Sequence, residues 1–196
     1  MPGRREFKDA RRAWKVAPLA SASAALALLL LATPEMTVAQ TAPPGFAQEF
    51  SGQFNASARK LVMLAEAMPE STYGWRPGEE VASVSEVFMH IARYNLLYPA
   101  ENLGVAPPAG MAGYADWEKT VTRKADVVRL LSESMEHVRF VASTLDAAAL
   151  EKETTLYGRK VAQWAVLLQL VSHMNEHLGQ SIAYARVNGV VPPWSR

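Results

Sequence analysis

The stretch His173-Met174-Asn175-Glu176-His177-Leu178-Gly179-Gln180 decides how this chain is interpreted. It lies in a proline-free segment, residues 161–188, whose apolar side chains recur at helical spacing. Residues four apart on a helix share one face, about 40° apart around the axis. His173 and His177 therefore present two imidazoles in the same direction, and Gln180 and Tyr184 continue the same stripe.

Two imidazoles at this spacing can chelate a divalent transition metal and need a third ligand from elsewhere in the chain. Only two other histidines exist, His90 and His137. Zinc, nickel, copper and iron all suit imidazole, so the ligand type alone does not identify the metal. A pair of histidines is by itself a weak signal. The alternative is that both side chains face solvent and that their spacing is a coincidence.

Four segments with helical periodicity predict an all-α fold, a four-helix bundle with functional side chains in its core. The predicted loops are residues 104–113 and 146–160, the second with Thr154, Thr155 and Gly158 as helix breakers, and no strand-like alternation is found. The predicted helices are Phe46–Met68, Val84 to about Tyr98 (opened by a Ser83–Glu86 capping box and closed by Pro99), Arg123–Leu145, and a fourth that ends at Gly189.

The second helix is expected to supply the third ligand. His90 lies mid-helix on an otherwise apolar face, where a lone histidine is more often a core residue than a ligand. Together with His173 and His177, however, it gives three histidines from two helices. Such a set can surround one metal and leave positions open for water or substrate, which is typical of a catalytic site.

Other polar residues near these positions have weaker claims. His137 lies at the edge of the inward stripe of its helix and is expected at the surface or boundary, outside the site. Gln180 and Tyr184 could bond to a metal-bound water or substrate, or only to each other and the backbone. For Tyr94 a role in the site and a structural role are equally open. Glu176 is expected to be solvated or to support a ligand, and no catalytic general base can be named.

The chain begins with features of a secretory signal peptide, residues 1–39. Six basic residues lie in the first 15 positions, an uncharged Ala- and Leu-rich stretch spans residues 16–32, and Thr37-Val38-Ala39 offers a cleavage site. The alternative is an uncleaved membrane anchor, although the stretch is barely long enough to span a bilayer. Arg4-Arg5-Glu6-Phe7-Lys8 also resembles a twin-arginine export signal. We expect a periplasmic or secreted protein with no stable membrane span after cleavage.

Composition limits what the mature chain, residues 40–196, can do. Its first 39 residues hold six basic and three acidic side chains, and removing them from totals of 20 and 19 leaves 14 and 16. The mature charge of about −2 leaves no basic patch that would favour nucleic acid. The chain has no cysteine, which excludes disulfides, cysteine ligands and cysteine nucleophiles.

Three motifs resemble the DinB-like (DinB/YfiT) family of metalloenzymes. Residues 173–195 (HMNEHLGQSIAYARVNGVVPPWS) resemble its C-terminal signature, residues 87–91 (VFMHI) resemble the segment of its first histidine, and Trp75-Arg76-Pro77 resembles its loop after the first helix. The resemblance covers about residues 45–195. It implies a four-helix bundle with a divalent metal held by His90, His173 and His177, and activities such as thiol-dependent transfer or isomerisation. The export signal departs from this, because low-molecular-weight thiols are mainly cytosolic.

Two hypotheses follow for function. The first is an exported metal-dependent enzyme, a hydrolase or transferase acting on a small molecule. The second is a non-catalytic helical bundle that binds metal or ligand and self-associates as a homodimer. The absence of an HExxH motif argues against a zincin-type protease.

Overall fold

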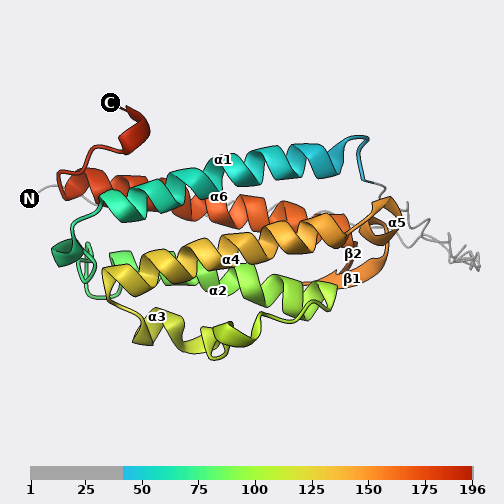
Figure 1. Ribbon diagram of the computed structural model, residues 1–196, viewed down its shortest axis with the longest axis horizontal. Coiled ribbons are helices and arrows are strands. Elements are labelled where there is room, and N and C mark those ends of the chain that lie inside the picture. The colour runs from blue at the N-terminus through green and yellow to red at the C-terminus, as the bar shows by residue number, and fades with distance from the viewer. Residues whose placement is uncertain (1–41, 196) are drawn as a thin grey trace, which may run out of the picture. The chain divides into compact units, whose positions relative to one another are not determined.

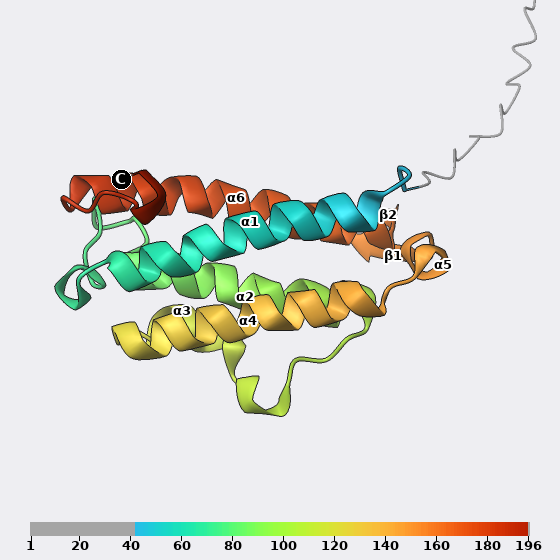
Figure 2. The same cartoon turned by 45° about the horizontal axis from the view of Figure 1, so that its top comes forward.

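Four long helices make up most of the described chain, residues 42–195 of the computed structural model (Figure 1). The predicted signal peptide, residues 1–39, lies outside the described residues. Helices α1 and α2 each pack against both α4 and α6, which gives a mostly helical bundle (Figures 1 and 2). The long helices are α1 (Phe46–Ala67), α2 (Val84–Leu103), α4 (Lys124–Thr144) and α6 (Gln163–Val187).

Shorter elements connect these helices. The α2–α4 connection contains α3 (Trp117–Thr120), and the α4–α6 connection contains α5 (Ala147–Leu150) followed by strands β1 (Glu153–Leu156) and β2 (Arg159–Ala162). Single 3-10 turns lie at Glu70–Thr72, Ala109–Met111, Tyr114–Asp116 and Pro193–Ser195. Among residues 42–195, no helix has both the length and the hydropathy needed to cross a membrane.

The bundle core is apolar and receives large side chains from every long helix. Phe54 and Leu61 of α1, Phe88 of α2, Leu131 of α4 and Leu167 of α6 are all at most 1% exposed. Burying one such side chain stabilises a fold by about 1.5–3 kcal/mol. Hydrophobic packing therefore carries the bundle, and we expect it to fold without a bound metal.

Helix α2 begins as predicted but continues past Pro99. The Ser83 hydroxyl accepts from the Glu86 amide while the Glu86 carboxylate accepts from the Ser83 amide, which is the predicted capping box. The prediction that Pro99 closes the helix is wrong, because a proline removes one helical hydrogen bond without forcing the chain to stop. The helix ends at Gly104, whose φ of 70° lets its N–H bond to the Pro99 carbonyl.

A β-hairpin replaces part of the predicted loop 146–160. Strands β1 and β2 pair antiparallel, with Thr154 opposite Val161 and Leu156 opposite Arg159. The two residues between them, Tyr157 and Gly158, both have positive φ, as a type I′ hairpin turn requires. Residues read as helix breakers are thus turn and strand residues, and α6 begins at Gln163, two residues later than predicted, because Val161 pairs in β2.

His137 is buried, which corrects the expectation of a surface or boundary position. Only 5% of the residue is exposed, and its Nε2 has no hydrogen-bond partner among residues 42–195. The connection after α2 passes over this face of α4, so that Pro108 and Met111 line a cavity together with His137. Helical periodicity ranks positions within one helix and cannot account for a loop that covers its edge.

Candidate metal centre

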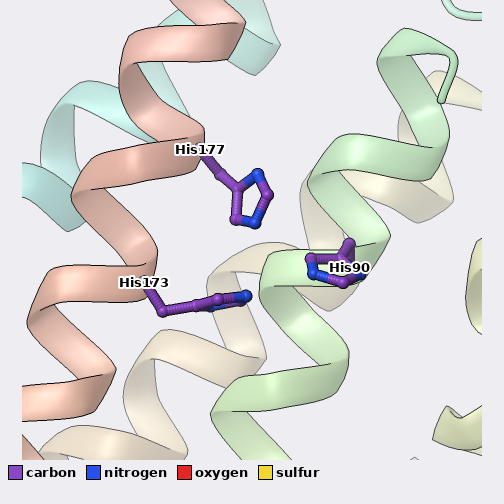
Figure 3. A group of neighbouring side chains, drawn as sticks. All are labelled: His90, His173 and His177. Atoms are coloured by element: carbon purple, nitrogen blue, oxygen red, sulfur yellow. The ribbon is translucent and has the colours of Figure 1, made fainter. Parts of the chain in front are cut away.

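Three of the four histidines meet between α2 and α6. His173 and His177 lie one turn apart on α6, and their rings face His90 on α2 (Figure 3). One ring nitrogen from each lies within 4.8 Å of those of the other two. The ring centroids are 4.6 Å apart for His173 and His177, 4.7 Å for His90 and His177, and 5.0 Å for His90 and His173. The structure therefore brings the three histidines predicted as ligands into one cluster.

A carboxylate on α3 orients the His90 ring. The Nδ1 atom of His90 lies 3.0 Å from Oε1 of Glu118, and that oxygen also accepts from Arg93, 3.0 Å away. A carboxylate can only accept, so the proton of His90 is on Nδ1 and its Nε2 has a free lone pair. A carboxylate that holds the remote nitrogen of a metal-binding histidine is a recurrent arrangement in metalloproteins.

A second chain of hydrogen bonds orients His177. The Tyr184 hydroxyl donates to the backbone carbonyl of Ala82 (3.1 Å), so its oxygen accepts from Nε2 of Gln180 (3.0 Å). This places Oε1 of Gln180 2.8 Å from Nδ1 of His177, which must donate to it. His177 too is left with a free lone pair on Nε2. Of the two roles open to Gln180 and Tyr184, the structure supports bonding to each other, to the backbone and to a histidine.

Burial keeps two of the histidines neutral near pH 7. Desolvation, with smaller contributions from His177 and His90, lowers the pKa of His173 to about 3. Desolvation also lowers the pKa of His90, although Glu118 partly offsets the effect. Only neutral imidazole binds a metal, so His90 and His173 present the protonation state that a divalent cation needs.

The residues present fit a divalent transition metal. The donor set is imidazole only, and hydrogen-bond partners fix the tautomer of two of the three rings. Within residues 42–195, no cationic side chain is bonded to any of these rings. His173 is 8% exposed, whereas His90 and His177 are half-buried, so the cluster faces solvent on one side. Three ligands on one side and access on the other match a site that keeps a coordination position for water or substrate.

The other candidate residues from the sequence lie at different distances from the histidine cluster. The Tyr94 ring packs against both His90 and His173, with centroid distances of 4.7 Å to each, so it borders the cluster. Glu176 is exposed, and His137 is not part of the cluster. The residue that sequence reasoning missed is Glu118. It lies 28 positions from His90 on a one-turn helix, and no local pattern marked it.

Comparisons with known proteins agree with this fold. The profile of the DinB superfamily matches residues 53–182, a span that contains all three clustered histidines. A crystal structure of a DinB-like protein from Bacillus cereus ATCC 10987 aligns with a TM-score of 0.59 at 16% identity, covering 76% of this chain and 95% of that chain. This likeness bears on the fold alone, and no curated protein matches the chain. Because the family profile covers well over half of the sequence, this chain belongs to the DinB superfamily.

Proposed function

We propose that this protein is an exported metal-dependent enzyme that acts on a small molecule, with hydrolysis as its primary reaction. The observation that supports the proposal is the cluster of His90, His173 and His177, whose nitrogens lie within 4.8 Å of one another. A divalent transition metal held there would supply Lewis acidity, which lowers the pKa of a water or thiol or polarises a carbonyl. Thiol-dependent transfer uses the same site, and export away from cytosolic thiols favours hydrolysis.

The chain's own residues have distinct tasks in this proposal. His90, His173 and His177 would hold the metal. Glu118 and Gln180 fix the orientation and tautomer of the His90 and His177 rings, which leaves the Nε2 lone pair of each free to bind it. Among residues 42–195, Glu118 is the carboxylate that bonds to a histidine of the cluster, and a bound metal would supply activation of the nucleophile.

An assay of metal-dependent turnover tests the proposal. The purified protein should hydrolyse a simple activated ester such as 4-nitrophenyl acetate, lose this activity after chelation, and regain it with one equivalent of metal. His177→Ala should lack the metal-dependent part of the rate. A parallel assay with glutathione and an electrophile detects thiol transfer. Equal rates in wild type and His177→Ala in both assays would support the non-catalytic binding bundle instead.

Export is a separate part of the proposal, supported by the basic start, the apolar stretch and the Thr37-Val38-Ala39 site. We expect a mature N-terminus at or near Gln40 and a periplasmic or secreted product. N-terminal sequencing of protein purified from separated cell fractions measures this directly. Cytoplasmic protein that retains residues 1–30 would refute export.

A further inference from the structure

A continuous row of aromatic side chains leads away from the histidine cluster. On α2, His90, Tyr94, Tyr98 and Asn102 follow one another at four-residue intervals and therefore lie along one face of the helix. The Tyr94 ring lies 4.7 Å from the rings of both His90 and His173, and the Tyr98 ring lies 5.1 Å from that of Tyr94. The Tyr157 ring continues the series, 6.2 Å from that of Tyr98. We call Tyr94, Tyr98 and Tyr157 the tyrosine row.

The last member of the row sits in an unusual place. Tyr157 is the first residue of the two-residue hairpin turn and has a φ of 51°, the only positive φ outside glycine among the described residues. Asn, Asp or Gly normally occupies this position, since a larger side chain in the left-handed region is strained. The ring is nevertheless 64% exposed, and its hydroxyl hydrogen-bonds to that of Tyr98. A strained and exposed aromatic residue at the far end of a row of rings that begins at the candidate metal centre suggests that its side chain is used.

Holding the hairpin in place does not account for Tyr157. The hairpin is already tied to the end of α2 by Asn102, whose backbone carbonyl accepts from the Thr154 hydroxyl and whose side-chain amide donates to the Thr155 backbone carbonyl. Its base is tied to α6 by the bond from the Gln163 amide to the Lys152 carbonyl, 2.9 Å. Figure 1 shows the hairpin at the end of the bundle where α2 ends and α6 begins.

We propose that the tyrosine row is the specificity surface of the metal centre, and that the substrate carries an extended aromatic group that lies along it. This inference rests on the proposed function, since it takes the histidine cluster as the anchor for the reacting end of the substrate. Tyr94 is half-buried beside the cluster and contacts the part of the substrate next to the metal. Tyr157 contacts the distal part, and the buried Tyr98 contacts both of these rings and supports them. Planar rings stack on tyrosine with geometry and energy that an aliphatic chain does not match.

Cobalt-loaded protein and three hydroxamates test this proposal through binding, with no need for turnover. Acetohydroxamate carries only the metal-binding group, benzohydroxamate adds one ring, and 4-phenylbenzohydroxamate adds a second ring in line. Titration is followed in the visible absorption of the bound cobalt. We expect the affinity to rise about three- to ten-fold with each added ring, the range of an aromatic contact.

Variants of Tyr157 test whether the gain in affinity from the second ring depends on that side chain. Tyr157→Asn should remove the gain from the second ring and leave acetohydroxamate binding unchanged, whereas Tyr157→Phe should keep the gain. Because Asn tolerates a positive φ, Tyr157→Asn should unfold at the same urea concentration as wild type or a higher one. Phe140→Gln is the matched control, because Phe140 is 60% exposed and lies on α4; it should change no affinity.

The outcomes separate the inference from the function on which it rests. If cobalt does not bind, or if acetohydroxamate leaves its spectrum unchanged, the metal centre itself fails and the inference falls with it. If all three hydroxamates bind with equal affinity, the metal centre stands and the tyrosine row is overturned as a specificity surface. Loss of stability in Tyr157→Asn with unchanged affinities would likewise show that Tyr157 serves only to hold the hairpin.

Discussion

Replacing His90, His173 or His177 with alanine is expected to abolish stoichiometric binding of a divalent transition metal. Each change removes one of the three nitrogen donors that lie within 4.8 Å of one another, and the two that remain cannot complete a three-ligand site. The loss of affinity should exceed 100-fold, the upper end of what loss of a supporting residue costs. Elemental analysis after dialysis measures metal content, and circular dichroism should show an intact helical bundle because the core is apolar.

Variants at neighbouring positions show whether the loss of metal is specific to the three histidines. Glu118→Ala and Gln180→Ala remove hydrogen-bond partners of His90 and His177, so each should weaken binding by about 10–100-fold without abolishing it. His137→Ala removes the one histidine outside the cluster and should leave metal content unchanged. Full occupancy in His90→Ala, or loss of metal in His137→Ala, would show that the ligand set is wrong.

Acidification is expected to destabilise the metal-free protein between about pH 6.5 and pH 3, partly through His173. The folded protein keeps this imidazole neutral, with a pKa of about 3, whereas the unfolded chain protonates it near its ordinary pKa. Throughout this window the unfolded state binds more protons, so the free energy of unfolding falls as the pH falls. One pKa unit corresponds to about 1.4 kcal/mol, and the loss should reach several kcal/mol near pH 4.

Urea unfolding at several pH values measures this effect. Carboxylates also titrate in this range, so the informative quantity is the difference between wild type and His173→Gln, whose side chain does not titrate. That difference should narrow steadily as the pH falls from 6.5, because wild type alone must keep the imidazole of His173 neutral. Parallel curves for the two proteins would refute the assignment of a strongly lowered pKa to His173.

The histidine cluster could be predicted because its main signal is local. His173 and His177 are four residues apart on one helix, and this spacing alone places both rings on one face. His90 could be added to the predicted site because it lies on the inward face of a second amphipathic helix and because the chain has only four histidines. The contact between Gln180 and His177 could also be expected from the sequence, because residues three positions apart lie side by side on a helix surface. In the structure the side-chain oxygen of Gln180 accepts from Nδ1 of His177.

The remaining features depend on contacts between distant segments. Glu118 reaches His90 from a one-turn helix in a connection that carried no periodic signal. His137 is buried by a loop that its own helix pattern cannot reveal. The hairpin was missed because four-residue strands are too short to show alternation, and because Tyr157 occupies a turn position where Asn, Asp or Gly is expected.

Anomalous diffraction at the absorption edge of the bound metal tests the central claim most directly. Crystals of the protein, purified without added metal, should give one strong anomalous peak between α2 and α6. The account predicts a nitrogen of each of His90, His173 and His177 at about 2.0–2.2 Å from that peak, with a further position open to water or substrate. A peak coordinated by other residues, or metal-free crystals from protein that binds no added zinc, nickel or iron, would contradict it.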